Sequence, residues 1–238
     1  MRKIAVLLAL TLVFCAACSK KETASEDSKP AQQTDVAEKE EKKDENEATS
    51  DSKDEEVTED NFRDFPVTDE SVFSTDPVEG GVQISSCKRD IQDKVVVVPG
   101  SINGQTVVAI GQGAFVEAEN VEAIVLPDSV ASVGTSAFTS CPNLKFVYFG
   151  SGLKETGDKM FNICNSIEKI ELPEGTERIG GYLAISCPSL KMIVIPESVT
   201  EISKRIVMSS EFNGVVKTPA GSFAETKALE DGLNVENY

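Results

Sequence analysis

Short apolar stretches recur along the second half of the chain, and a proline or glycine closes each of them. The stretches IVLP, VYFG, IELP and IVIP begin at residues 124, 147, 170 and 193, so they are 23 residues apart. Alternating apolar positions within a stretch are typical of a short strand with one buried face. Proline has no amide hydrogen to donate to a β-ladder and therefore marks the end of a strand. The pattern predicts a row of equally spaced strands.

Positions between the strands repeat with the same period. One unit of this length cannot bury its apolar side alone, whereas stacked units build a continuous core. A period of 23 residues falls within the range of leucine-rich repeats. We therefore expect a leucine-rich-repeat solenoid over 99–214, with parallel strands stacked on one face and an irregular or helical second face. The recurring columns are Val133, Thr156, Ile179, Ile202; Val130, Leu153, Thr176, Val199; Phe115, Phe138, Phe161, Ala184, Val207; and Leu144, Ile167, Leu190.

The first repeat is longer than the others. Pro99 and Pro127 are 28 residues apart, and an insertion within 100–111 accounts for the excess. After it, Ala114-Phe115 returns to the phase of Ala137-Phe138. We expect a bulge in the first coil rather than a domain boundary.

The complete unit reads I-x-I-P-x-x-V-x-x-I-G-x-x-A-F-x-x-C-x-x-L, and VLPDSVASVGTSAFTSCPNL (125–144) fits it almost throughout. This motif resembles the BspA-like, treponemal-type leucine-rich repeats of bacterial surface proteins. Residues 61–98 are expected to form an N-terminal capping region, and 215–238 a C-terminal capping repeat with a short helix around Phe223 to Asp231. Departures from the motif suggest looser packing towards the C-terminus, namely Thr156, Leu183-Ala184 and Ser210.

The resemblance implies binding rather than catalysis. Proteins with this repeat are generally lipid-anchored or cell-wall proteins that bind other proteins, and some bind host matrix glycoproteins. The expected function is therefore protein–protein binding or adhesion, with a host matrix or envelope protein as partner. Carbohydrate or cell-wall binding, and a structural role in an envelope complex, remain alternatives.

The N-terminus has the layout of an export signal. Arg2 and Lys3 precede an apolar run that is too short to span a membrane, and small residues follow it directly before Cys18. This arrangement resembles a bacterial lipobox, with residues 1–17 as the signal peptide and Cys18 as the lipidated residue. Phe14 excludes Cys15 from that role, because the site needs a small residue there. We expect an exported protein anchored in the bacterial cell membrane or outer membrane.

Residues 18–60 are expected to be a disordered tether. The stretch 19–60 holds 16 acidic and 7 basic residues and no Leu, Ile, Phe, Tyr or Met. Such a chain buries too little apolar surface to offset the entropy of ordering. Residues 61–238 keep a net charge of −10, which would repel nucleic acid.

The amino-acid composition disfavours most kinds of catalysis. The chain has no histidine, which is the commonest general base and zinc partner, and no nucleophile or paired-carboxylate arrangement stands out. We expect no enzyme activity, no metal and no cofactor. The sequence gives no indication of the oligomeric state.

Three cysteines share one column of the repeat, namely Cys141, Cys164 and Cys187. Equal spacing puts them in a row about 4.8 Å apart rather than around a point, which disfavours a metal site. Ala118 and Ser210 hold the same position in neighbouring repeats, which favours small buried thiols. A disulfide within the row, or one that includes Cys87, stays open.

The strand residues that flank the buried column should point outward and form one regular face. Several of them are aromatic or aliphatic, more than a solvated surface needs. They are therefore candidates for the core of a partner-binding patch, although residues 61–79 are an equally good candidate to cover them. The candidate residues are Val125, Phe146, Tyr148, Met192 and Val194.

Overall fold

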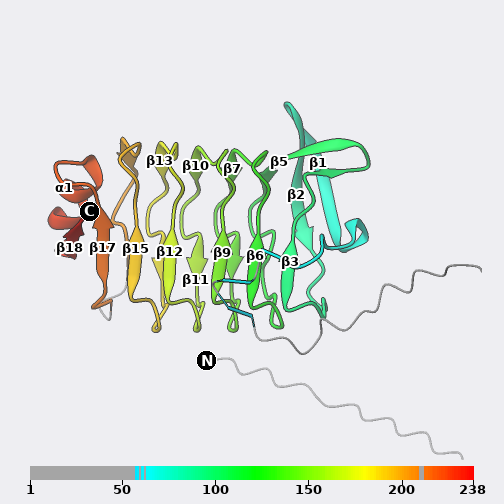
Figure 1. The fold of residues 1–238 in the computed structure, drawn as a ribbon, viewed down its shortest axis with the longest axis horizontal. Coiled ribbons are helices and arrows are strands. Elements are labelled where there is room, and N and C mark those ends of the chain that lie inside the picture. The colour runs from blue at the N-terminus through cyan, green and yellow to red at the C-terminus, as the bar shows by residue number, and fades with distance from the viewer. Residues whose placement is uncertain (1–56, 59, 62, 209–211) are drawn as a thin grey trace, which may run out of the picture. The chain divides into compact units, whose positions relative to one another are not determined.

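The computed structural model describes residues 57–58, 60–61, 63–208 and 212–238. Their coils stand side by side in chain order, as Figure 1 shows. Within this part of the chain, no helix has the length and hydropathy to cross a membrane. The expected signal peptide and Cys18 lie outside the described residues, as do nearly all of the expected tether and Ser210.

One side of the solenoid carries the row of strands that the sequence predicts, and we call it the strand face. Paired strands in this row are parallel, and in three of the pairs the partner residues are 23 apart, as in Ala123 with Phe146, Lys169 with Met192 and Met192 with Val215. The row consists of two sheets that meet between β9 and β12 (Figure 1). In order they are β3 (Val95–Val97), β6 (Ala123–Val125) and β9 (Phe146–Tyr148), then β12 (Lys169–Glu171), β15 (Met192–Val194), β17 (Val215–Thr218) and β18 (Asn234–Asn237).

The other two sides of the coils also carry strands. A long sheet runs along one of them, from a hairpin at its N-terminal end through one two-residue strand per coil. Its strands are β1 (Phe73–Val78), β2 (Gly81–Cys87), β5 (Gln105–Ile110), β7 (Ser132–Val133), β10 (Glu155–Thr156), β13 (Arg178–Ile179) and β16 (Glu201–Ile202). The third side holds β8 (Phe138–Thr139), β11 (Phe161–Asn162) and β14 (Ala184–Ile185).

Of the two options for the second face, irregular or helical, the structure has the irregular one. Each coil turns at residues with positive φ, such as Ser136 at 56° and Ser140 at 57°, on either side of β8. A left-handed residue does not fit into a right-handed helix, so the stretch forms two tight turns with a two-residue strand between them. The same positions one coil later are Lys159 and Ile163.

The insertion in the first repeat is a small hairpin. β4 (Ser101–Ile102) pairs antiparallel with the start of β5, and Asn103 and Gly104, both with positive φ, form the turn. An Asn-Gly pair is the preferred sequence for this kind of two-residue hairpin. The predicted bulge is confirmed, and the solenoid continues through it.

Aromatic rings stack along the core. The ring centroids of Phe115 and Phe138 are 5.6 Å apart, and those of Phe138 and Phe161 are 5.2 Å apart. All three side chains are fully buried. Offset stacking at these distances adds to the gain from burial, so the ladder ties three successive coils together.

The departures from the motif that the structure describes remain buried. Where Ala137 precedes Phe138, the later coil has Leu183 before Ala184, and both of the latter are buried. The large side chain has moved to the neighbouring position. Both positions therefore stay closed to solvent, although leucine is smaller than the phenylalanine of the earlier coils. Thr156 remains buried and accepts a hydrogen bond at 3.3 Å from the amide of Gly180.

The last coil is closed by helix α1 (Phe223–Glu230), near the position that the sequence predicts. Ser222 caps its start by accepting from the amide of Glu225 at 3.1 Å. Ala224 and Ala228 are buried against the core. The buried carboxylate of Asp231 accepts from the amide of Ile206 at 2.7 Å, which joins this unit to the coil before it.

Glycines at one corner let the backbones of successive coils approach closely. A Cβ atom on Gly157 would lie 2.4 Å from the amide nitrogen of Thr135, and one on Gly180 would lie 2.2 Å from the carbonyl carbon of Gly157. Real Cβ atoms do not approach backbone so closely, so a larger residue there forces the coils apart.

We expect Gly157→Ala to lower the free energy of unfolding by about 2 kcal/mol, since it introduces overpacking against rigid backbone. Gly100→Ala is the matched control, because a Cβ atom at Gly100 meets nothing within 4 Å. Urea denaturation of both variants measures the difference. Equal midpoints for the two variants would show that the corner is not a tight contact.

Candidate functional site

The five candidate residues occupy the strand face as predicted. Val125 lies on β6, Phe146 and Tyr148 on β9, and Met192 and Val194 on β15, and each is partly exposed. The strand residues between them belong to the core: Ile124 and Ile193 are fully buried and Val147 packs against the core. The alternation of a short strand therefore places these apolar side chains outside.

A segment from the N-terminal side of the solenoid lies on part of this face, and we call its described residues 57–58, 60–61 and 63–65 the strap. Val57 is only 3% exposed and forms a small cluster with Val95 and Ala123. Phe65 packs against the same cluster. The guanidinium carbon of Arg63 lies 4.3 Å from the ring centroid of Tyr148, which is a cation–π contact.

The strap separates the candidates into two groups. Val125, Phe146 and Tyr148 pack against the cluster that the strap joins, whereas Met192 and Val194 are not part of it. Residues 61–79 were the candidate cover of the strand face. Among them, Phe65 packs against its cluster, whereas Val72 and Phe73 pack against the main core. Val67 is exposed, and Phe62 lies outside the described residues.

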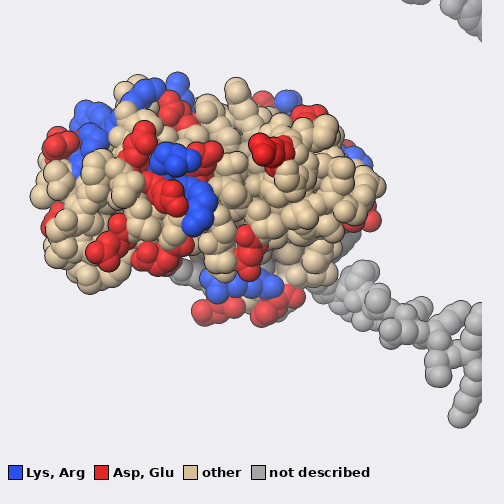
Figure 2. All heavy atoms as spheres, turned by 90° about the horizontal axis from the view of Figure 1, so that it is seen from above, with Lys and Arg blue, Asp and Glu red and all other residues tan. Residues whose placement is uncertain are grey.

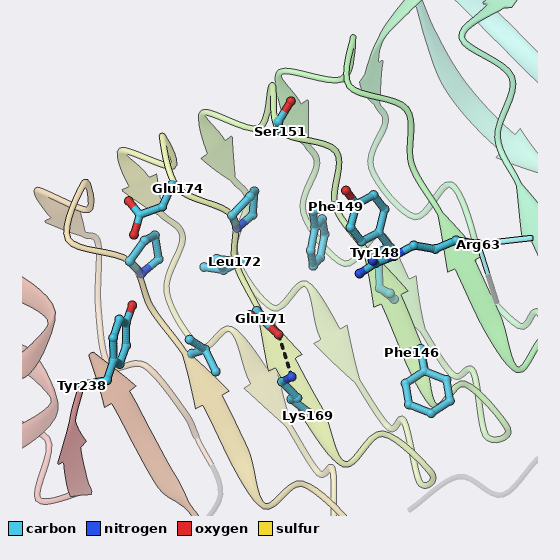
Figure 3. Close-up of a pocket in the computed structure, with 14 residues that line it drawn as sticks. Arg63, Phe146, Tyr148, Phe149, Ser151, Lys169, Glu171, Leu172, Glu174 and Tyr238 are labelled. Carbon is cyan, nitrogen blue, oxygen red and sulfur yellow. Dashed lines mark ion pairs between the residues drawn. The ribbon is translucent and has the colours of Figure 1, made fainter. Parts of the chain in front are cut away.

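A pocket of about 310 Å³ opens on the strand face where the two sheets meet. In Figure 3, Arg63 and Tyr148 lie at one end of it, and Glu174 and Tyr238 at the other. The pocket thus lies between the strap and the C-terminal unit. Its walls are formed by Arg63, Phe146, Val147, Tyr148, Phe149, Ser151, Lys169, Glu171, Leu172, Pro173, Glu174, Val194, Pro196 and Tyr238.

Negative charge gathers at one end of the pocket. Lys169 forms an ion pair with Glu171 at 2.7 Å across the strand face (Figure 3). Partial burial raises the pKa of Tyr238, and the carboxylates of Glu174, Glu171 and Glu197 raise this pKa further. A phenol responds in this way when negative charge gathers beside it. The C-terminal end of the pocket is therefore acidic.

The face seen in Figure 2 differs from the pocket in how its charged side chains are distributed. Acidic and basic side chains lie there next to one another among uncharged ones, rather than in a patch of one sign. The long sheet carries ion pairs between coils, such as that of Arg178 with Glu155. Such pairs are typical of a solvated surface.

The cysteine column is buried in the core. The thiols of Cys141 and Cys164 donate to the carbonyl oxygens of Phe115 and Phe138, each at 3.0 Å. Cys141, Cys164, Cys187 and Cys87 are all free thiols. Among the described residues, no three His, Cys, Asp or Glu side chains are placed to hold a metal ion.

The surroundings of two of these thiols, Cys87 and Cys164, oppose ionisation. Burial raises the pKa of the Cys87 thiol to about 12. The neighbouring thiols of Cys141 and Cys187, together with burial, raise the pKa of Cys164. When the folded pKa of a thiol is raised, the unfolded chain ionises first. The contribution of Cys87 and Cys164 to stability is therefore full below about pH 9 and is lost as the pH rises above it.

We expect the four buried thiols to resist alkylation in the native protein at pH 8, because burial keeps the reagent from all of them. At Cys87 and Cys164 the raised pKa also makes the reactive thiolate scarce. Mass spectrometry of peptides after timed alkylation measures each site separately. In denaturant all four should react within the same time. Rapid alkylation of Cys164 without denaturant would contradict the buried environment.

Three residues of the site were not expected from the sequence. Val57 lies in the stretch that was expected to be a disordered tether, and Arg63 precedes the repeats without any motif. Tyr238 was included in the capping repeat only. A single valine after a long acidic run is the one signal that could have pointed to the strap.

Residues 101–218 match the family described as "BspA type Leucine rich repeat region", in six copies. No curated protein matches the chain. The predicted resemblance is confirmed: this region consists of BspA-type leucine-rich repeats, and the fold is a leucine-rich-repeat solenoid. That fold is a binding scaffold, and its repeats are typical of bacterial surface proteins.

Solved structures agree with this assignment. A leucine rich repeat protein of T. pallidum is 28% identical, with a TM-score of 0.59 over 64% of this chain and 71% of that one. A leucine rich cell surface protein of Faecalibacterium prausnitzii is also 28% identical, with a TM-score of 0.52 over 65% of this chain and 39% of that one. The pneumococcal vaccine antigen PcpA, at 14% identity and a TM-score of 0.50 over 69% of this chain and 48% of that one, shares the fold.

Proposed function

We propose that this protein is an exported, lipid-anchored surface protein whose strand face binds a protein partner. The observation that carries the proposal is the row of partly exposed apolar residues on this face, with a pocket among them. Exposed aromatic and aliphatic side chains around a concavity are typical of recognition surfaces. One of the similar structures is named a leucine rich cell surface protein, which supports the location.

The anchor would be Cys18, reached through the acidic tether. We expect Cys18→Ser to move the protein from the membrane fraction to the released fraction and to abolish incorporation of a clickable fatty acid. Cys15→Ser is the matched control and should remain lipidated and membrane-bound. Membrane-bound, labelled protein in the Cys18→Ser variant would contradict lipidation at this residue.

The binding face is tested by replacing Phe146, Tyr148 and Met192 together with serine. We expect capture of the partner from host matrix and envelope extracts to fall at least tenfold. Because Phe146 and Tyr148 also belong to the cluster that the strap joins, a second variant replaces only Met192 and Val194, which are not part of it. The control replaces Ile163, Met208 and Phe223, three exposed apolar residues outside the strand face.

Urea denaturation must first show that each variant still folds. Unchanged capture by both strand-face variants would rule out this surface. A glycan array probed with the same proteins addresses the alternative: specific glycan binding that the strand-face variants lose would replace a protein partner with a carbohydrate.

A further inference from the structure

The pocket between the sheets offers two different environments for one ligand group. At one end Arg63 lies over the ring of Tyr148, and the other end is formed by Tyr238 and Glu174 (Figure 3). Apolar groups line the space between them, among them Val194 and Pro196. A long side chain with an apolar stem and a polar head matches that sequence of surfaces.

The chain itself shows that the strand face accepts a guanidinium group. Arg63 of the strap lies over Tyr148 at 4.3 Å from the ring centroid. Guanidinium groups stack on aromatic rings because they are planar and weakly hydrated. Tyr238 provides a second aromatic ring on the same pocket.

Carboxylates at the Tyr238 end are not neutralised. The lysines of this face have acidic partners: Lys169 with Glu171 and Lys217 with Glu236, each at 2.7 Å. Glu174 and Glu197, by contrast, form no ion pair within the part of the chain that the structure describes. Glu174 lines the pocket, and Glu197 is its equivalent one coil later, directly after Pro196 of the pocket wall. The charge of both helps to raise the pKa of the Tyr238 phenol.

We infer that this pocket receives an arginine side chain from the protein partner, with the stem between the sheets and the guanidinium between Tyr238 and the carboxylates of Glu174 and Glu197. This inference rests on the proposed function, because it names the chemistry of the same face. A guanidinium stacks on a ring and donates to carboxylates at once, whereas an ammonium group lacks the planar fork. The acidic end disfavours a carboxylate or phosphate ligand.

The test compares two blocked peptides on the full chain, acetyl-Gly-Ser-Arg-Ser-Gly-amide and the same peptide with citrulline in place of arginine. Citrulline keeps the shape and removes the charge. Nuclear magnetic resonance titration reports affinity and location together. We expect the arginine peptide to bind at least fivefold more tightly, to shift the resonances of Tyr238 and to lose affinity as salt is raised.

A double variant isolates the carboxylates. Glu174→Gln with Glu197→Gln should weaken the arginine peptide about fivefold and leave the citrulline peptide unchanged. The control is Glu79→Gln with Glu119→Gln, which removes the same net charge from two exposed positions away from the pocket. Equal losses in both double variants would reduce the effect to overall charge and overturn the inference.

Three further results would overturn it: equal binding of the two peptides, no binding of either, or shifts confined to residues outside the pocket. A neutral oligosaccharide that shifts Tyr148 and Tyr238 when the arginine peptide does not would also overturn it. None of these results affects capture of the partner through the strand face. Undiminished capture by both strand-face variants, in turn, refutes the proposed function whatever the peptides do.

Discussion

The close approach of backbone to backbone at the glycine corner sets the spacing of the coils. At Gly157 and Gly180 there is no room for a side chain, so each coil lies directly against the one before it. With that distance fixed, residues 23 apart pair across neighbouring strands, and the phenylalanines stack at 5.2 and 5.6 Å. The core, the registers and the strand face are consequences of one repeated contact.

The same regularity explains how one face of the solenoid can differ from coil to coil. A repeated strand must direct alternate residues outward, and the outward positions are free to vary without disturbing the core. In this chain they change from apolar on β6 and β9 to charged on β12 and apolar again on β15. The strap lies over the first part, and Tyr238 borders the pocket from the other side. A repetitive surface thereby becomes a particular site.

Much of the fold could be predicted, because the 23-residue period of the sequence marks both the ends of the strands and the buried positions. Pro127 and Pro173 mark strand ends, and the columns through Phe138 and Val133 mark buried positions, as the structure shows. The turns could not be predicted, because residues other than glycine, among them Ser136, Lys159 and Ile163, take the left-handed positions there. Nor could the strap, since Val57 is held by residues of the strand face rather than by any local pattern. The outward residues could be predicted from the alternation of apolar positions alone. The pocket could not, because it lies where two sheets meet, and no sequence pattern marks that place.

Photo-crosslinking on intact cells tests the central claim, recognition through the strand face, most directly. A crosslinking residue at position 192 would stand on the strand face, and one at position 163 on an exposed position outside it. The account predicts a discrete adduct with a partner protein from position 192 and none from position 163. An adduct from position 163 without one from position 192 would contradict it.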